Sequence, residues 1–537
     1  MIIFVSDMFV EDYVGGAELT SEAIIKDSLL PVIKVHSNSV STTLMRQYQD
    51  KFWIFGNFSA LKEQCLMFAI KNLDYAVLEY DYKFCSYRSP EKHVAHSGIC
   101  SCHTERRGKL ISIFYAKSKA TWFMSESQRS VYCNKFSFLD SPKTKVLSSV
   151  FSSDTLEYIE SLDCSNKDDK WIILNSDSWI KGRQSALHYA KQNNLDYDLV
   201  WGLEHKELLK KMASSKGLVY IPPGGDTCPR LVIEAKLLGC QLILNDNVQH
   251  KDEAWFQTKE STMSYLKERT NVFWSTMENL WQLKTPPASD KQNQKFNFIV
   301  PFYNAGSWIG KCIKSIRGQK HSNFMCYLVD DMSTDNTIEK IKKEIHGDIR
   351  FKLIQNTEKK YALGNIVGVL VGEDLGLDDV NIILDGDDWL SSYNALSHLD
   401  RVYSEKDCLM TYGTYVYYPM GTIGVEPSEY PHEVVENNSF RSDKWRASHL
   451  RTFKTRLFKH IDLEDLKNEE GKYYKTAYDQ ALMLPLLELA GSKSEYIDKV
   501  LHVYNRENPL NVDKVKQRLQ FQTAQKIRSK KPYGRKY

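Results

Sequence analysis

The chain has no long hydrophobic run: no stretch approaches the roughly eighteen consecutive apolar residues that a membrane-spanning helix needs. We therefore expect no transmembrane helix. The N-terminus has no basic start and only a short apolar run within residues 1–7, which predicts a buried strand rather than a signal peptide. Regularly spaced cysteine pairs are also missing, since the eleven cysteines are an odd number at irregular spacing. This pattern favours a reducing, cytoplasmic setting over a disulfide framework.

The chain does have the composition of ordinary globular domains, with 42% hydrophobic and 26% charged residues, which argues against wholesale disorder. Its 537 residues are too many for one hydrophobic core. Residues 283–294 are polar, contain adjacent prolines and lack periodicity, so they mark a linker. We expect a multidomain α/β protein with Rossmann-like lobes at residues 1–165 and 166–285, a linker at 286–296, a third α/β domain at 297–510 and a basic tail at 511–537.

In the C-terminal half, short apolar segments alternate with helical patterns. The segments begin at Phe298, Met325, Phe351 and Val380, and polar residues follow each of them. Such alternation predicts a parallel sheet, and parallel sheets bind ligands outside the carboxyl ends of their strands. We therefore expect these polar residues to share one ligand-binding edge.

The most informative of these polar segments is Asp385-Gly-Asp-Asp388, which follows the fourth strand-like segment. Three carboxylates within four residues repel one another. A divalent cation that bridges the protein to a phosphate would stabilise them, because hard carboxylate oxygens suit Mg²⁺ or Mn²⁺. The alternative is a solvated acidic turn, where Asp and Gly are common. The position at the expected ligand edge favours a metal site made by Asp385, Asp387 and Asp388.

Three ordered motifs, Pro301-Phe-Tyr-Asn304, Val329-Asp-Asp-Met-Ser-Thr-Asp335 and Leu384-Asp-Gly-Asp-Asp-Trp389, resemble those of the inverting glycosyltransferases of family 2, which have the GT-A fold. The resemblance covers residues 296–510. One small departure is Met332, where that family usually has a small residue. The resemblance implies a UDP- or GDP-sugar donor, a Mg²⁺ or Mn²⁺ ion, and donor contacts from Pro301, Tyr303, Asn304, Asp330, Asp331, Asn365, Asp387, His449 and Arg506.

The resemblance also implies a reaction, in which a sugar passes from a nucleoside diphosphate to an acceptor hydroxyl with inversion. Negative charge grows on the leaving diphosphate, and a bound dication stabilises it. The acceptor hydroxyl loses a proton, so a general base is needed. Our candidate is Asp479 in Thr476-Ala-Tyr-Asp-Gln480. The alternative for Asp479 is a capping position near a helix start.

The N-terminal half shows a second strand–helix alternation. Gly15 and Gly16 follow the first strand, where glycines let the backbone approach a ligand at a helix N-terminus. Together with Lys181, Asp226 and Glu234 they resemble the family 4 type of glycosyltransferase, with the two-lobed GT-B fold, over residues 1–285.

That resemblance implies a ribose contact for Glu234, but the Arg that such proteins carry shortly before the lysine is missing from residues 175–180. A bidentate diphosphate contact is lost with it. Two interpretations follow: a second active transferase, or a degenerate lobe that positions the acceptor.

One group of residues stands apart: Cys85, His93, His96, Cys100, Cys102 and His103. Cys and His are the usual ligands of Zn²⁺. The Cys-x-Cys-His spacing is not a standard zinc pattern, however, so ordinary packing or loop residues are the favoured interpretation.

Residues 511–537 carry nine Lys or Arg and one Asp. This basic tail predicts contact with anionic lipid, which would place the protein peripherally at the inner face of the membrane, or with nucleic acid; a solvated, frayed terminus is the alternative.

For the whole chain we expect a glycosyltransferase in polysaccharide or glycoconjugate assembly, with a carbohydrate or lipid-linked acceptor. The alternatives are a non-catalytic carbohydrate- or nucleotide-binding scaffold, a glycosyltransferase acting on modified nucleic acid bases, and a nucleotidyltransferase. The last usually has a Gly-rich, basic loop on its first strand, which residues 298–304 lack.

Overall fold

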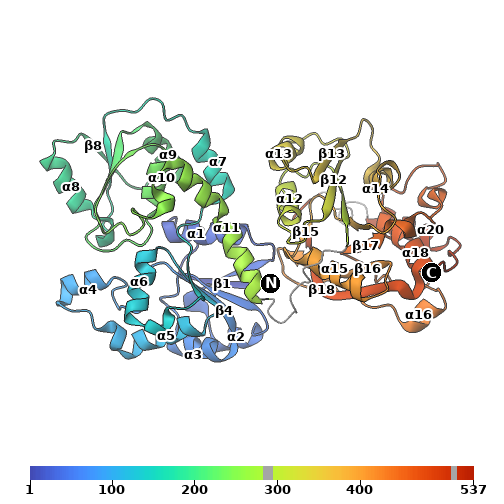
Figure 1. The fold of residues 1–537 in the computed structure, drawn as a ribbon, viewed down its shortest axis with the longest axis horizontal. Coiled ribbons are helices and arrows are strands. Elements are labelled where there is room, and N and C mark those ends of the chain that lie inside the picture. The colour runs from blue at the N-terminus through green and yellow to red at the C-terminus, as the bar shows by residue number, and fades with distance from the viewer. Residues whose placement is uncertain (282–293, 510–516) are drawn as a thin grey trace. The chain divides into compact units, whose positions relative to one another are not determined.

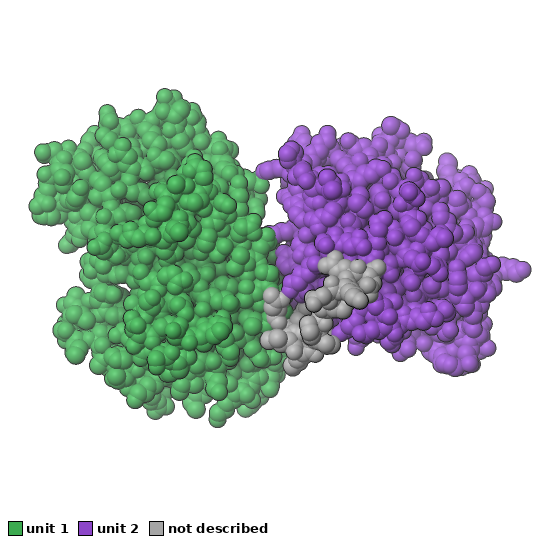
Figure 2. All heavy atoms as spheres, viewed as in Figure 1, with its two compact units in different colours: residues 1–28, 32–284 green, residues 29–31, 285–537 purple. Residues whose placement is uncertain are grey.

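The computed structural model describes residues 1–281, 294–509 and 517–537, so most of the expected linker at 286–296 lies outside the described residues. The chain divides into two compact units (Figures 1 and 2), unit 1 with Met1–Ser28 and Val32–Lys284, and unit 2 with Leu29–Pro31 and Thr285–Tyr537. Parallel sheets with helices around them confirm the multidomain α/β class. Within the described residues, every helix is too short or too polar to cross a bilayer.

Unit 1 contains a six-stranded parallel sheet in the order β2-β1-β3-β4-β5-β6. Its strands are β1 (Ile2–Ser6), β2 (Val32–His36), β3 (Phe52–Phe55), β4 (Asp74–Glu79), β5 (Ala120–Phe123) and β6 (Thr144–Val146). The helices around it are α1 (Gly16–Lys26), α2 (Thr42–Gln47), α3 (Glu63–Asn72), α4 (Pro90–Ser97), α5 (Arg106–Lys117) and α6 (Glu126–Lys135). Central strands such as β1 and β3 are buried along their whole length, because helices cover both faces of a parallel sheet.

A second sheet in unit 1 has four parallel strands in the order β10-β9-β7-β8. Its elements are β7 (Trp171–Leu174), α8 (Arg183–Gln192), β8 (Tyr197–Val200), α9 (His205–Ser214), β9 (Gly217–Tyr220), α10 (Arg230–Leu237) and β10 (Gln241–Leu244). The long helix α11 (Lys259–Trp281) packs against α10 and also against α1 and α7 (Ser153–Ser161) of the first lobe. There the Trp274 indole donates to the Ile24 carbonyl at 3.0 Å, which ties the two lobes together.

Unit 2 is built on one mixed sheet in the order β13-β12-β11-β14-β17-β16-β18-β15. The first four strands are parallel, and β17 joins them antiparallel to β14. The strands are β11 (Phe296–Phe302), β12 (Phe324–Asp330), β13 (Phe351–Gln355), β14 (Val380–Ile383), β15 (Trp389–Leu390), β16 (Met410–Tyr418), β17 (Arg451–Lys454) and β18 (Ser494–Asn505). The helices are α12 (Ile309–Arg317), α13 (Thr337–Glu344), α14 (Tyr361–Gly372), α15 (Ala395–Glu405), α16 (His432–Glu436), α17 (Thr455–Phe458), α18 (Tyr478–Ala490) and α20 (Gln517–Arg528).

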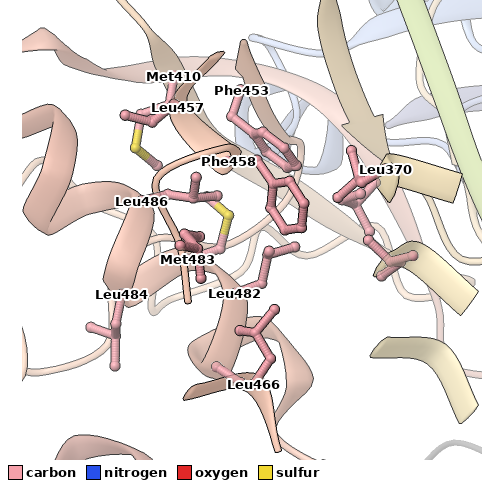
Figure 3. Close-up of a cluster of buried hydrophobic side chains, with 14 of the residues drawn as sticks. Leu370, Met410, Phe453, Leu457, Phe458, Leu466, Leu482, Met483, Leu484 and Leu486 are labelled. Carbon is pink, nitrogen blue, oxygen red and sulfur yellow. The ribbon is translucent and has the colours of Figure 1, made fainter. Parts of the chain in front are cut away.

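The sheet of unit 2 has a hydrophobic core on each face. Side chains of β11 alternate between them: Ile299 belongs to the cluster around α14 and α18, while Phe298 and Val300 belong to the cluster around α12. Figure 3 shows the first cluster, in which Leu482 and Leu486 of α18 lie among side chains from other elements of unit 2. Each such buried side chain contributes about 1.5–3 kcal/mol to stability. The core therefore holds α18, whose first turn carries Asp479, firmly against the sheet.

Residues 517–537 pack onto unit 2 rather than extending as a free tail. Ile527 of α20 is 2% exposed and belongs to the core. Arg528 donates to the Gln480 side chain at 2.8 Å, and the Tyr533 hydroxyl donates to Asp465 at 2.5 Å. Part of the basic charge thus serves internal contacts, and binding of the tail to lipid or nucleic acid stays a prediction.

Candidate active site

Three polar segments meet at the carboxyl edge of the sheet in unit 2. The backbone N–H of Asp331, after β12, donates to the Phe302 carbonyl at 2.9 Å, and that of Gly386, after β14, donates to Pro301 at 3.1 Å. Gly386 is needed at this crossing, since a Cβ there would lie 2.5 Å from Phe302 Cβ. Backbone hydrogen bonds therefore bring together the three segments that the sequence predicted to lie at one ligand-binding edge.

Asp385 and Asp387 are the partly exposed carboxylates of the acidic cluster. The Tyr478 hydroxyl donates to both oxygens of Asp385 at 2.7 Å, and the Arg451 guanidinium lies 4.0 Å away. Asp387 accepts a hydrogen bond from the Asn508 side chain at 2.6 Å. Burial, together with the carboxylates of Asp388 and Asp385, raises the pKa of Asp387 to about 8. The protein alone thus leaves negative charge here under-compensated, as a site for a divalent cation requires.

Asp388, the third aspartate of the expected ligand set, has different surroundings from Asp385 and Asp387. Its side chain is buried, one oxygen lies 2.9 Å from His502 Nε2, and the other accepts the backbone N–H of Asn505 at 2.8 Å. Asp388, His449 and His502 bring potential metal-ligand atoms within 4.8 Å of one another. Both oxygens of Asp388 are thus engaged with residues of β18, and its place in the metal-ligand set stays a prediction.

The two histidines beside Asp388 are neutral, and Arg451 provides the positive charge there. His449 stacks on His502 with ring centres 4.3 Å apart, and Arg451 Nη2 lies 3.0 Å from His449 Nδ1. Burial and the Arg451 charge hold the pKa of His449 well below its usual value and lower the pKa of His502 to about 3. A neutral imidazole can still donate one N–H to a phosphate or sugar oxygen, so the predicted contact of His449 stays a prediction, while Arg451 brings positive charge beside it.

Asp479 lies in the first turn of α18, beside Tyr478. The residue before them, Ala477, has a left-handed backbone with φ of 52°, which costs a non-glycine residue about 1 kcal/mol or more. Asp479 is half-buried, its charge contributes to the raised pKa values of Arg451 and Glu426, and its carboxylate makes no hydrogen bond within the described residues. Asp479 therefore does not form the N-cap of α18, which is Ala477, and its role as general base stays a prediction.

The residues predicted to contact the nucleotide lie at the same edge of the sheet, but several of them form hydrogen bonds or ring contacts with neighbouring loops. Tyr303 is 38% exposed, with Lys359 Nζ 3.5 Å from its ring centre. The buried Asp331 accepts the backbone N–H groups of Lys360 and Tyr361, at 2.8 and 3.2 Å, at the start of α14. Asp330 accepts the Ser333 N–H at 2.9 Å through one oxygen. Of the two aspartates, Asp330 is therefore the better placed for a ligand.

The two predicted asparagines have mixed roles. Asn304, with φ of 48°, accepts the Thr334 N–H at 2.8 Å and fixes one loop against its neighbour. Asn365 accepts from Asn356 at 2.6 Å, while its own buried Nδ2 has no hydrogen-bond partner among the residues described.

The predicted Arg506 follows β18. Its backbone N–H donates to the Tyr418 carbonyl at 2.8 Å, and its guanidinium lies 5.7 Å from the Tyr417 ring centre.

Sequence reasoning missed Arg451, Tyr478, Asn508 and His502. Arg451 stands two residues after His449, and strand alternation would have placed both side chains on one face. Tyr478 is next to Asp479 in the motif that was quoted. Asn508 and His502 had no local signal, since only the pairing of β15 with β18 brings them to the acidic cluster.

In unit 1 the predicted residues also converge, but mostly on one another. Lys181 pairs with Asp226 at 2.9 Å, and the Tyr220 hydroxyl donates to the same carboxylate at 2.6 Å. The buried Glu234 lies 3.0 Å from Arg230 Nε and 2.8 Å from His205 Nε2. These contacts satisfy the acid that was expected to bind ribose.

The glycines of unit 1 lie beside these pairs. Gly15 forms the N-cap of α1, and a Cβ at Gly16 would lie 3.6 Å from Arg230 Cβ. Arg230, which sequence reasoning did not single out, also donates to the Val150 carbonyl at 2.6 Å.

Four of the six cysteine and histidine residues singled out in the first lobe lie close together, and two of them, Cys85 and Cys102, also pack in its core. Cys85, His93, Cys100 and Cys102 bring one potential ligand atom each within 4.8 Å of one another, whereas His96 and His103 lie outside this group.

Residues 297–462 match the model of glycosyl transferase family 2. Unit 2 contains a glycosyl transferase family 2 domain. The match includes the segments that form the acidic edge. It does not reach residues 1–285, so their resemblance to the family 4 type stays a prediction.

Comparisons with single proteins gave partial likenesses. Glycosyltransferase GlyG of Streptococcus pneumoniae serotype 4 is 28% identical over 126 residues, 24% of this chain and 40% of that protein. An uncharacterized glycosyltransferase of Haemophilus influenzae is 29% identical over 121 residues, 22% of this chain and 47% of that protein. The chain thus spans less than half the length of these curated relatives. The crystal structure of S. aureus TarS 1–349 in complex with UDP is similar at a TM-score of 0.32 and 18% identity, covering 44% of this chain and 64% of that one.

Proposed function

We propose that unit 2 transfers a sugar from a nucleoside diphosphate to an acceptor hydroxyl, with inversion. The observation that carries the proposal is the acidic edge, where the cationic Arg451 lies 4.0 Å from Asp385 and also near Asp479, whose carboxylate makes no hydrogen bond among the described residues. A general base, a cation and paired metal-binding carboxylates are what this reaction requires. The family 2 match, which covers Asp385, Asp387 and Arg451 but ends before Asp479, supports the assignment.

We assign Asp385 and Asp387 to Mg²⁺ or Mn²⁺. The donor set fits, because both side chains offer hard oxygen atoms and together they carry charge that the protein does not fully balance. When bound, the ion would stabilise the negative charge of the departing diphosphate. Tyr478 fixes the Asp385 carboxylate through its hydroxyl, and Asn508 fixes Asp387.

The remaining residues divide between donor and acceptor. Arg451 binds a donor phosphate: its Nε is buried and has no hydrogen-bond partner within the described part of the chain. Tyr303 stacks on the base, Asp330 binds the base or ribose, and Arg506 contacts the diphosphate or sugar. Asp479 accepts the proton of the attacking hydroxyl. The stereochemical outcome, inversion, requires that this base lie on the face opposite the leaving group.

For unit 1 we infer an acceptor-positioning role rather than a second transferase activity. Glu234 is held by Arg230 and His205, and Asp226 by Lys181 and Tyr220. A donor would have to break these buried contacts, and breaking a buried ion pair is costly. The acceptor we propose is a growing polysaccharide or a lipid-linked oligosaccharide.

The test is a screen of UDP- and GDP-sugars with the full chain and Mn²⁺ or Mg²⁺, measuring release of the nucleoside diphosphate and transfer to carbohydrate acceptors. We expect release with one donor class, abolished by a chelator and by Asp387→Asn. Donor binding without release, unchanged by both treatments, would instead identify a binding scaffold.

A further inference from the structure

Four potential metal ligands converge in the first lobe of unit 1, outside the candidate active site. The Sγ atoms of Cys85 and Cys100 are 3.7 Å apart. His93 Nδ1 lies 3.6 Å from the sulfur of Cys85 and 3.3 Å from that of Cys102. All four ligand atoms lie within 4.8 Å of one another.

These separations have the size of the edges of a zinc tetrahedron. With Zn–S bonds of about 2.3 Å and Zn–N bonds of about 2.0 Å, tetrahedral angles place two sulfurs about 3.8 Å apart and a sulfur and a nitrogen about 3.5 Å apart. The Cys85–Cys100 and Cys85–His93 distances agree closely with these values. A disulfide needs sulfurs about 2.0 Å apart, and all the cysteines are free.

The ligands come from three pieces of backbone with separate supports. Cys85 is 1% exposed in the core of the lobe, on the loop after β4. His93 lies on α4, which begins where Ser89 accepts the Lys92 N–H at 3.2 Å. Cys102 is fixed by α5, since a Cβ at Gly108 would lie only 2.1 Å from the Cys102 carbonyl oxygen. Because the backbone at each ligand is held by its own contacts, the four side chains are fixed close together by the fold.

Helix α4, which carries His93, has little other support. It has eight residues, and none of its side chains is buried. A helix this short is not stable alone, and most helices in proteins are held by a buried apolar face. Because α4 has no such face, a metal ligand on it supplies the anchor that packing does not.

Contacts around the ligands also fix their positions. The Ser86 hydroxyl lies 3.6 Å from the Cys102 sulfur. The Tyr87 ring stacks on His93 with centres 4.7 Å apart and an interplanar angle of 22°, which orients the imidazole. Zinc sites use such outer contacts to fix their ligands.

We propose that Cys85, His93, Cys100 and Cys102 bind one structural Zn²⁺, which anchors α4. Four protein ligands close the coordination sphere, so the ion has no open position for catalysis. The anchored helix lies against the second lobe, where a Cβ at Gly224 would be 3.0 Å from Glu91 Cβ. The next residues, Gly225 and Asp226, lead to the Lys181 pair, so the zinc sets one wall of the region between the two lobes of unit 1.

The first experiment measures metal in the full chain, purified under reducing conditions and dialysed against metal-free buffer to remove weakly held Mg²⁺ or Mn²⁺. We expect about one Zn²⁺ per chain. Two matched pairs of variants locate it: Cys100→Ser against Cys164→Ser, both partly exposed free cysteines, and His93→Asn against His96→Asn, both on α4. Zinc should be lost from the first member of each pair and retained in the second.

A second measurement uses the wild-type chain and so does not depend on a variant folding. A mercurial reagent that titrates thiols should release zinc, and replacement by Co²⁺ should give the absorption of a tetrahedral, thiolate-bound ion. Zinc well below one per chain, equal loss in both members of a pair, or a Cys85–Cys100 disulfide found by peptide mapping of the unreduced protein would each overturn the proposal.

Discussion

The acidic edge of unit 2 and the region between the lobes of unit 1 hold similar kinds of residues in opposite electrostatic states. In unit 2, Asp387 has a pKa raised to about 8 by burial and by the carboxylates next to it, and Asp479 has no hydrogen-bond partner among the described residues. In unit 1, Asp226 and Glu234 each contact a cationic side chain within 3.0 Å. A motif marks where a ligand could bind, whereas the number of internal partners decides whether the site is open to one.

The largest difference between the two units is expected for the matched variants Asp387→Asn and Asp226→Asn. We expect the first to lower nucleoside diphosphate release about 10³-fold, because a metal ligand that balances the leaving group is lost. Asp226→Asn should leave nucleoside diphosphate release by unit 2 within about twofold, because Asp226 belongs to unit 1 and substitutions at independent sites rarely affect one another. Steady-state assays of both variants decide it. A large loss in Asp226→Asn would show that unit 1 catalyses donor cleavage.

Asp479→Asn tests the proton acceptor. Removing a general base costs about 10²-fold or more in kcat, while the affinity for the donor should hardly change. Glu426→Gln is the control. The Glu426 carboxyl lies near Asp479, since burial and the charge of Asp479 raise the pKa of Glu426, but Glu426 has no assigned role. Donor affinity is measured by calorimetry with the unreactive nucleoside diphosphate. Equal kcat loss in both variants would contradict the assignment of Asp479.

In unit 1 the largest expected effect is on stability. Glu234→Gln leaves the buried Arg230 without its ion-pair partner, so we expect a loss of about 3 kcal/mol in the free energy of unfolding. Chemical denaturation of the full chain measures it, with Glu207→Gln on helix α9 as an exposed control. Weakened donor binding with unchanged stability would point instead to the ribose contact implied by the family 4 resemblance.

The sequence predicted the parallel strands of unit 2 well, because buried strands of a parallel sheet are continuous apolar runs with polar residues at their ends. The beginnings of β13 and β14, at Phe351 and Val380, were read directly from that pattern. The contacts of Asp388 could not be predicted from the sequence. Its partner His502 is 114 residues away and comes close only because Leu390 pairs with His502 in the sheet. Local periodicity contains no information on such a register.

Two further differences have the same origin. The basic composition of residues 511–537 predicted an exposed tail. It gave no sign that Ile527 is buried in the core of unit 2, where it holds α20 in place. The cysteine spacing fits no standard zinc pattern because an entire helix, α4, lies between Cys85 and Cys100. In both cases the decisive contacts join segments whose spacing in the sequence does not reveal their proximity.

The smallest effect we expect is a pH dependence of the stability of unit 1. His250 of unit 1 is fully buried, between Trp255 stacked at 5.4 Å and Phe256 at 4.6 Å, and burial lowers its pKa to about 4 from the ordinary 6.5. Above pH 6.5 the ring is neutral in both the folded and the unfolded chain. Between pH 6.5 and 4 only the unfolded chain gains the proton, so stability falls with pH, by about 2–3 kcal/mol over the window.

His250→Phe retains the aromatic packing and removes this titration, so its loss of stability between pH 6.5 and 4 should be smaller than that of the wild type by the same amount. Denaturation midpoints at several pH values measure the difference. Unit 2 supplies the control: His398, whose pKa burial also lowers to about 4, keeps its own contribution in the variant, so some acid sensitivity must remain. Parallel stability curves for wild type and His250→Phe would mean that the buried ring is not held neutral.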